Sequence, residues 1–231
     1  MKHKIYYTLM FLIATTLVVL AVRYEHRFNN EKIIRDAVKD YHASREYERH
    51  EYEAILYKIM AVERGFTIGL RKRGVWHKDS DRLTVAEMET VALALYAAQK
   101  THGIKYEAFL ALITVESGWN KNLIGVTGDV GLTQQHPHFF YWYKSIMRVK
   151  RKARIRDVKD NILAGIFEIL WCREYGENTE LRLEDIIAAY NAGAPRVFSG
   201  YIPESTKAYI RRWRYYYSAY VENEFDAYAN F

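Results

Sequence analysis

The sequence predicts an all-α protein. Apolar residues recur at helix-like spacing along most of the chain, and no alternating apolar and polar run is long enough to predict a strand. Proline, which interrupts helices, occurs only 3 times in 231 residues, first at Pro137. Half of the residues are apolar, as in folded proteins with a sizeable core. We therefore expect long helices around one main core.

The first expected helix is the apolar segment 5–22, which contains no charged residue. At about 1.5 Å per residue, its length just crosses a hydrocarbon core about 30 Å thick. Lys2 and Lys4 precede it, so residues 1–23 are expected to form an uncleaved, single-pass signal anchor. The remainder of the chain would then lie outside the cytoplasm, on the periplasmic or cell-wall side. A cleaved signal peptide is the alternative, but the segment lacks a clear small-residue cleavage site.

Residues 24–64 are expected to form a long charged helix, because they contain no glycine or proline and place opposite charges at helical spacing. Two interpretations stay open for this helix. It is either a spacer or partner-binding helix, as in an envelope or virion complex, or a solvated helix packed on the domain. Three glycines then predict a break over residues 65–81. The expected organisation is a charged helical stalk and linker over 24–81, followed by a domain over 82–231.

The helices of this domain are expected in the following order. Thr84 to Glu87 has the form of a capping box, and it opens a helix that ends near Thr101. The next helix runs from Lys105 to Ser117. A loop over residues 118–138 follows it. The later expected helices or turns cover residues 139–149, 157–175, 183–192 and 204–223.

A glutamate stands at the end of the apolar helix 105–117. Glu116 is followed by Ser117, by a glycine and then by a loop with glycines at positions 125, 128 and 131. A carboxyl at the end of a buried helix, facing a loop that approaches closely, is placed as a general acid with a raised pKa. Taken alone, a glutamate near a helix end more often faces water. The surrounding motifs favour the catalytic interpretation.

Four local patterns occur together, and their joint order and spacing are specific although each pattern alone is weak. They are Glu116-Ser117 with Trp119-Asn120, Gly128 to Gln134 with Pro137, Asp160-Asn161-Ile162 with Gly165, and Ala188 to Gly193.

With these patterns, residues 95–216 resemble the soluble lytic transglycosylase family, whose fold is lysozyme-like, of the goose type. The family's Glu-Ser pair matches Glu116 and Ser117. Its Gly-Leu-Met-Gln motif matches Gly131 to Gln134, with threonine in place of methionine. Its Ala-Tyr-Asn-x-Gly motif matches Ala189 to Gly193, and Tyr209 matches a tyrosine of its last helix. The resemblance implies a lysozyme-like catalytic domain over residues 82–231.

The resemblance also implies an activity, which is cleavage of peptidoglycan glycan strands between N-acetylmuramic acid and N-acetylglucosamine. Glu116 would act first as acid and then as base, while the 6-hydroxyl of muramic acid closes onto its own C1 and leaves a 1,6-anhydro end. This reaction needs no cofactor and no protein nucleophile. Residues implied to orient Glu116 and the substrate are Ser117, Gln134, Tyr190, Asn191 and Tyr209.

Aromatic side chains beside these motifs are candidates for stacking on sugar faces, with ordinary packing as the equally open alternative. These side chains are Trp119, Tyr141, Trp142 and Tyr143.

Asp129 keeps a second reaction open. As a second carboxylate across a water-sized gap from Glu116, it would allow inverting hydrolysis by a muramidase. As a local turn residue, which is the favoured interpretation, it would instead satisfy N–H groups of its own loop. A third hypothesis is a non-catalytic glycan-binding scaffold that works through the charged helix, although such a protein has no need of Glu116.

Composition excludes several other classes. The excess of 34 basic over 28 acidic residues suits an anionic polymer, a membrane or a cell wall. No long basic run is interleaved with aromatic residues, so nucleic acid is not an expected partner. The single cysteine, Cys172, lies in an apolar helix and is expected to be packed there. His102, His136 and His138 lack partners at a known ligand spacing, so no metal site is expected.

Overall fold

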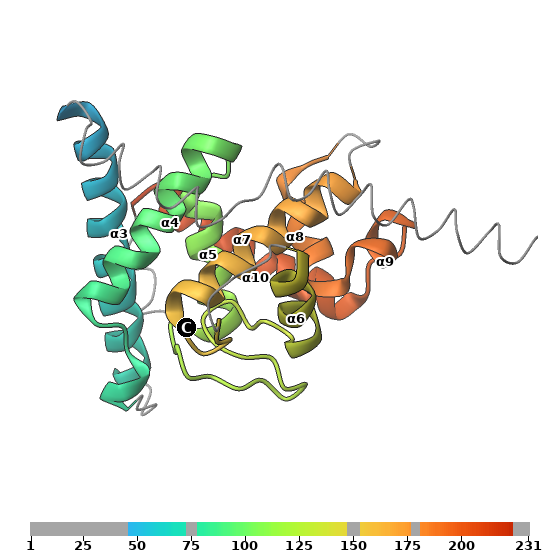
Figure 1. Cartoon of the computed structure of the whole chain (residues 1–231), viewed down its shortest axis with the longest axis horizontal. Helices are drawn as coiled ribbons and strands as arrows, with labels where there is room; N and C mark the ends of the chain where they lie inside the picture. The colour runs from blue at the N-terminus through green and yellow to red at the C-terminus, as the bar shows by residue number, and fades with distance from the viewer. Residues whose placement is uncertain (1–45, 73–77, 147–152, 177–180, 224–231) are drawn as a thin grey trace, which may run out of the picture.

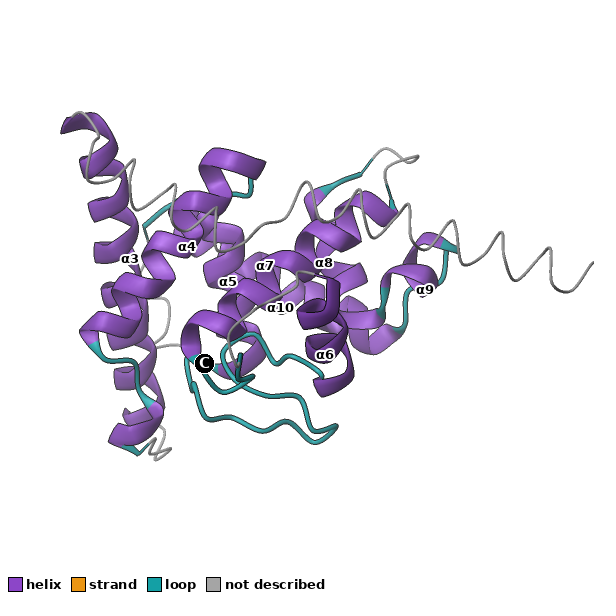
Figure 2. Cartoon of the chain, in the orientation of Figure 1, coloured by secondary structure: helices purple, strands orange, loops and turns teal. Residues whose placement is uncertain are grey.

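The computed structural model describes residues 46–72, 78–146, 153–176 and 181–223. Within these ranges the fold is all-α, as predicted, and only isolated β-bridges occur, in the loop after α5 (Figure 2). The elements in chain order are α3 (Glu46–Lys72), the short 3-10 helix η1 (Asp79–Asp81), α4 (Val85–His102), α5 (Tyr106–Ser117), α6 (Pro137–Ile146), α7 (Val158–Tyr175), α8 (Leu183–Ala192), α9 (Ala194–Phe198) and α10 (Glu204–Val221).

Helix α5 lies at the centre of the core. Its residues 108–114 each expose 4% or less of their surface, because α10 and α4 pack against it. Helix α7 is almost as deeply buried, and it packs against α4 and α8. Figure 1 shows these helices side by side, with the loop between α5 and α6 at one edge. The central position of α5 holds its carboxyl end, and therefore Glu116, in a fixed place.

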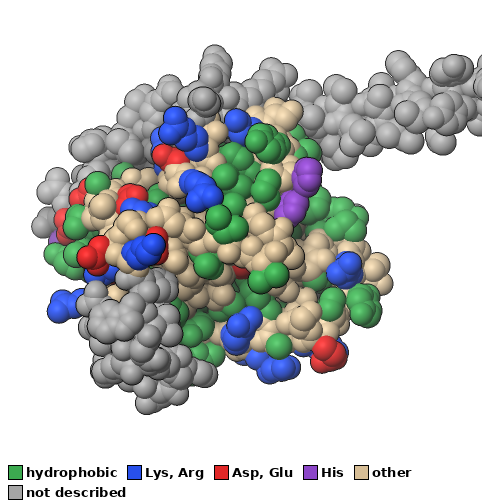
Figure 3. Space-filling model, turned by 90° about the horizontal axis from the view of Figure 1, so that it is seen from below, with side chains coloured by type: hydrophobic (Ala, Val, Ile, Leu, Met, Phe, Trp, Pro, Cys, Tyr) green, Lys and Arg blue, Asp and Glu red, His purple; other side chains and the backbone are tan. Residues whose placement is uncertain are grey.

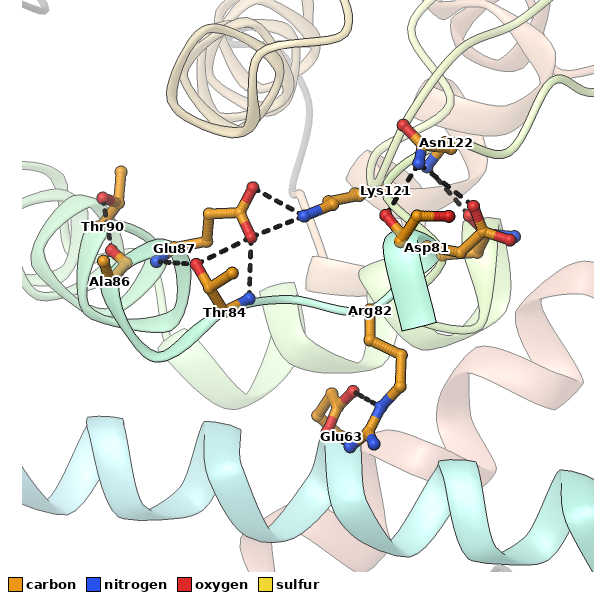
Figure 4. Close-up of polar contacts among 11 residues, drawn as sticks. Glu63, Asp81, Arg82, Thr84, Ala86, Glu87, Thr90, Lys121 and Asn122 are labelled. Carbon is orange, nitrogen blue, oxygen red and sulfur yellow. Dashed lines mark hydrogen bonds and ion pairs between the residues drawn. The ribbon is translucent and has the colours of Figure 1, made fainter. Parts of the chain in front are cut away.

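Most helix boundaries agree with the sequence prediction. The capping box at the start of α4 is present, since the Glu87 N–H donates to Thr84 Oγ1 at 3.2 Å and the Thr84 N–H donates to Glu87 Oε2 at 2.7 Å (Figure 4). Helix α8 begins and ends at the predicted residues. The five-residue helix α9 was not predicted, because a segment that short shows no periodicity.

The charged helix α3 packs onto the rest of the fold. Its buried stripe faces α4, and three of the stripe's residues, Ile55, Ile59 and Val62, are fully buried. The break predicted from Gly65 is wrong in its first part, because α3 continues through Gly65 and Gly69 to Lys72. Tertiary packing outweighs the cost of about 1 kcal/mol for each glycine in a helix. The packed-helix interpretation therefore applies to the described part of this segment.

Buried charges also attach α3 to its neighbours. Lys58 Nζ donates to the carbonyl oxygen of Tyr220 at 2.7 Å and lies 3.6 Å from Glu107 Oε1. Glu63, which is only 2% exposed, accepts two hydrogen bonds from Arg82, at 3.0 and 2.9 Å (Figure 4). Such ion pairs are costly to break once buried. The expected boundary between a stalk (24–81) and a domain (82–231) therefore does not coincide with a gap in packing.

We expect Ile59→Ala to lower the free energy of unfolding by about 2–5 kcal/mol, because it leaves a cavity at a fully buried position. Tyr57→Ala on the same helix is the matched control, since Tyr57 is 71% exposed and should change stability by less than about 0.5 kcal/mol. Urea unfolding followed by circular dichroism measures both. Equal stabilities of the two variants would show that α3 is not part of the folded core.

The expected signal anchor, residues 1–23, lies outside the described residues. In the described ranges, no helix combines the length and the apolar character needed to cross a membrane.

Candidate active site

Glu116 lies in the last turn of α5, where the chain turns sharply. Gly118 adopts a left-handed conformation with φ 56°, and its N–H donates to the carbonyl of Thr114 at 3.1 Å, which ends the helix. The partly buried carboxyl of Glu116 reaches α10, where the hydroxyl of Tyr209 donates to Oε1 at 2.5 Å. Helix α10 therefore orients the carboxyl that α5 presents.

The surroundings of Glu116 raise its pKa to about 7. Burial is the largest cause, because it disfavours the charged form, and the nearby charge of Asp129 adds to the effect. The hydrogen bond from Tyr209 and the positive charge of Arg212 act in the opposite direction. Glu116 therefore keeps its proton up to about neutral pH. Once the proton has left, Tyr209 and Arg212 stabilise the carboxylate.

Asn161 of α7 holds the loop that follows α5. Its Oδ1 accepts from the N–H of Thr133 at 2.9 Å, and its Nδ2 donates to the carbonyl of Val130 at 2.8 Å. Glycines make room for this clamp. A Cβ on Gly131, whose φ is 83°, would lie 2.6 Å from Asn161 Nδ2, and one on Gly165 would lie 2.8 Å from Thr133 Cγ2. The sequence patterns at 128–134 and 160–165 are therefore in direct contact.

The residues that were predicted to orient Glu116 form hydrogen bonds mainly within the loop and the helices around it. Gln134 Nε2 donates to the carbonyl of Gly131 at 2.8 Å, and Ser117 Oγ donates to the carbonyl of Ile113 at 3.2 Å. Tyr190 of α8 donates to the carbonyl of Thr133 at 2.6 Å. Asn191 Oδ1 accepts from Thr206 Oγ1 of α10 at 2.8 Å. Helix α8 therefore joins the loop to α10 and so fixes the surroundings of Glu116.

A hollow of about 330 Å³ lies at Glu116. One wall comes from α3, because Phe66 packs so closely on Gly118 that a Cβ there would lie 2.6 Å from the Phe66 ring. Arg212 and Tyr216 of α10 line another side. Figure 3 views the molecule from the side of the α5–α6 loop, and it shows basic and apolar side chains spread over this face. Glu116 therefore lines a hollow that is bounded by α3, α5 and α10.

Comparison with known proteins matches residues 94–207 to the family described as Transglycosylase SLT domain. This segment belongs to the soluble lytic transglycosylase family. The match includes Glu116, the Asn161 clamp and Tyr190, and it ends two residues before Tyr209.

The transglycosylase domain is similar in structure to the 70 kDa soluble lytic transglycosylase from Escherichia coli, with 21% sequence identity and a TM-score of 0.46. The similarity covers 63% of this chain and 29% of that one, so the chain spans less than a third of that protein's length. Among curated proteins, no significant match was found.

Trp119 does not line the site of the transglycosylase domain. It is only 2% exposed, and its indole N–H donates to Thr114 Oγ1 at 2.9 Å. The expected stacking on a sugar is therefore wrong for Trp119, because the left-handed turn after Glu116 folds the ring into the core. Tyr143 is equally buried, whereas Tyr141 and Trp142 of α6 expose 68% and 37% of their surface.

Asp129 takes part in its own turn. Its Oδ2 accepts a hydrogen bond from the hydroxyl of Thr127, and its carbonyl accepts from the N–H of Gly125 at 2.8 Å. The side chain therefore bonds within its own loop, as favoured from the sequence, but its partner is a hydroxyl and not the N–H groups that were expected. Asp129 is also close enough for its charge to raise the pKa of Glu116, so the structure keeps it at the edge of the site.

The structure adds one carboxyl that the sequence prediction missed, Glu168 of α7. Its Oε2 accepts from Gln135 Nε2 at 3.0 Å, and the same amide donates to the hydroxyl of Tyr190 at 2.7 Å. Burial, together with the charges of Glu116 and Asp129, raises the pKa of Glu168 to about 8. The available signal was an acidic residue inside the apolar run Ile166 to Leu170.

Among the described residues, the remaining reactive side chains show no second site. Cys172 is 1% exposed, and burial raises the pKa of its thiol well above the ordinary value. The rings of His136 and His138 stack with centroids 5.3 Å apart on the exposed start of α6. In the ranges that the structure describes, no three ligating side chains are grouped in a way that suits a metal ion.

Proposed function

We propose that this chain is a lytic transglycosylase that cleaves peptidoglycan between N-acetylmuramic acid and N-acetylglucosamine and leaves 1,6-anhydro ends. The observation that carries the proposal is the position of Glu116. Its carboxyl is partly buried, has a pKa of about 7 and accepts a hydrogen bond from Tyr209. Membership of residues 94–207 in the transglycosylase family supports the same substrate class.

In the first step, the carboxyl of Glu116 gives its proton to the glycosidic oxygen. The bond between C1 of muramic acid and that oxygen breaks, and the N-acetylglucosamine part leaves with a new hydroxyl. The resulting carboxylate lies beside the positive charge that develops at C1. Tyr209 keeps its hydrogen bond to Oε1 throughout, which leaves Oε2 for proton transfer and stabilises the negative charge.

In the second step, the carboxylate of Glu116 takes the proton of the muramic acid 6-hydroxyl while O6 bonds to C1. The 1,6-anhydro ring closes, Glu116 regains its proton, and no water is consumed. A pKa near 7 suits both steps, because a general acid and base works best when its pKa is close to the working pH.

A muramidase is the second candidate function, because the charge of Asp129 reaches Glu116. Digestion of purified peptidoglycan with the full chain, followed by mass spectrometry, separates the two reactions. A transglycosylase releases anhydro-muramic ends, which are one water lighter than the reducing ends that a muramidase releases. Binding without any soluble product would favour the glycan-binding scaffold instead.

Cleavage by the wild-type protein is expected to slow as the pH rises through about 7, because the reaction begins from protonated Glu116. An ordinary glutamate would already have lost most of its proton by pH 5.5. Initial rates of release of soluble fragments between pH 5 and 9 measure this dependence. A rate that is still rising at pH 8 would contradict an acid role for Glu116.

We expect Asp129→Asn to keep at least about a third of the wild-type rate, because the side chain of Asp129 bonds within its own turn and a general base contributes ~10²-fold or more. Asparagine also accepts a hydrogen bond from Thr127, so the turn should persist. The same digestion assay compares the two proteins at pH 6. A loss of ~10²-fold or more would favour the muramidase.

The cellular setting is a further proposal. An anchor formed by residues 1–23 would hold the catalytic domain outside the cytoplasm, and the part of the charged segment 24–64 that precedes α3 would serve an envelope or virion complex. Retention of the full chain in membranes after a carbonate wash would support the anchor, and its release would overturn it.

A further inference from the structure

Glu168 occupies an unusual place in α7. Its neighbours in the run 160–170 are all buried, and Glu168 is the one residue of that run with partial exposure. Its carboxyl contacts the buried amide of Gln135, and it lies within electrostatic reach of Glu116 and Asp129. The carboxyl of Glu168 therefore lies on the side of α7 that faces the loop between α5 and α6.

The hydrogen bonds of Glu168 lead into the loop. Gln135 is fully buried, and its amide nitrogen donates both to Glu168 Oε2 and to the hydroxyl of Tyr190. Tyr190 in turn donates to the carbonyl of Thr133. Removing the carboxyl would leave a buried N–H group of Gln135 without its acceptor. A buried donor without an acceptor destabilises the fold around it. Glu168 thus holds residues 133–135 in place through hydrogen bonds from the α7 side of the loop.

The groups that face Glu168 are acidic or neutral. Five groups interact electrostatically with Glu168. They are Glu116 of α5, Asp129 of the loop, Cys172 of α7, Tyr190 of α8 and Tyr209 of α10. None of these groups is a cation that would compensate a negative charge. The charge of Glu116 raises the pKa of Glu168, so the two carboxyls lose their protons in separate steps. The first negative charge of this pair therefore lies mainly on Glu116, whose pKa is the lower of the two.

We propose that Glu168 is a positioning residue of the transglycosylase reaction, where its uncharged carboxyl holds Gln135 and Tyr190 in place and leaves the site's negative charge to Glu116. This inference rests on the proposed function, and it assigns to the site a second carboxyl that neither attacks the sugar nor activates water. It also gives the loop residue Gln135 a defined role, as the link between α7 and α8.

Two substitutions of Glu168 separate positioning from simple packing. Glu168→Ala removes the acceptor, and we expect its kcat to fall at least tenfold while KM stays within about twofold. Glu168→Gln keeps the shape and an acceptor for Gln135, so it should recover most of the wild-type kcat at pH 6. Glu204→Gln is the matched control, because Glu204 is exposed on α10 and pairs only with Lys207 among described residues. Wild-type kcat in the alanine variant would overturn the proposal.

The pH profile tests the proposed division of charge between the two carboxyls. In the wild-type protein, Glu168 keeps its proton while Glu116 loses its own, so the neutral side chain of Glu168→Gln should leave the alkaline fall in rate where it is in the wild-type protein. A clear shift of that fall to lower pH would show that Glu168 is charged in the working range, and it would overturn the proposed division of charge.

A titration of the carboxyl carbons by ¹³C NMR tests the inference without any substrate. Signals of Glu116 and Glu168 are assigned by their loss in the two glutamine variants. We expect Glu168 to titrate at lower pH in Glu116→Gln than in the wild-type protein, because the opposing charge of Glu116 is gone. Identical titration in both proteins would overturn the inference even if digestion of peptidoglycan failed, whereas failure of digestion with a clear shift would overturn only the proposed function.

Discussion

Glu116→Gln is expected to reduce release of soluble peptidoglycan fragments by at least ~10³-fold, because glutamine has no proton to give to the glycosidic oxygen. The substitution keeps the size of the side chain and an acceptor for the Tyr209 hydroxyl, so the fold should persist. Digestion at pH 6 with equal amounts of both proteins measures the loss.

The control for this prediction is the structure of the variant itself. Its unfolding temperature and far-ultraviolet circular dichroism should match those of the wild-type protein, and it should still bind insoluble peptidoglycan. Normal turnover by the variant would exclude Glu116 as the acid. A loss of folding together with activity would indicate that the carboxyl serves stability instead.

The second large effect is expected at Asn161. Asn161→Ala should lower the free energy of unfolding by about 2–4 kcal/mol, because it removes buried hydrogen bonds to Thr133, Val130 and Ile155 together. The loop then loses its clamp on α7, so the rate of cleavage should fall at least tenfold even where the variant remains folded. Urea unfolding and digestion at low temperature measure the two effects separately.

Asn122→Ala is the matched control for this substitution. Asn122 also donates to a backbone carbonyl, that of Ser80 at 2.9 Å, but it is exposed to solvent (Figure 4). Water can replace its hydrogen bonds, so we expect a change of less than about 1 kcal/mol. If both asparagine variants were equally stable, the clamp would not contribute to the fold as described.

Local signals explain why much of the helical framework was predictable. The capping box at Thr84 satisfies free N–H groups of its own helix, and Gly118 ends α5 through its own left-handed backbone. Such features depend on residues a few positions apart. For the same reason, a local role of Asp129 in its glycine-flanked turn could be expected, although its partner, the hydroxyl of Thr127, could not.

Other features depended on partners distant in the sequence. The charged pattern of α3 fits either a solvated spacer or a packed helix, and only burial of Ile55 and Ile59 against α4 decides between them. From the sequence, an aromatic residue just after a helix end could lie either in the core or in a binding cleft. The backbone turn at Trp119 places its ring in the core. Glu168 was missed because its hydrogen-bond partner Gln135 lies 33 residues earlier in the chain.

The sequence by itself determined most of the helices, and it determined that a glutamate lies in the last turn of a strongly apolar one, before a glycine-rich loop. These are consequences of spacing, caps and backbone freedom, which act over a few residues. Tertiary structure decided what contacts that glutamate, although the family resemblance had already pointed to Tyr209. The hydroxyl of Tyr209 comes from 93 residues away, the wall at Phe66 comes from α3, and the second carboxyl comes from α7. The acidity of Glu116 arises from these contacts, because burial and nearby charges exist only once the helices have packed.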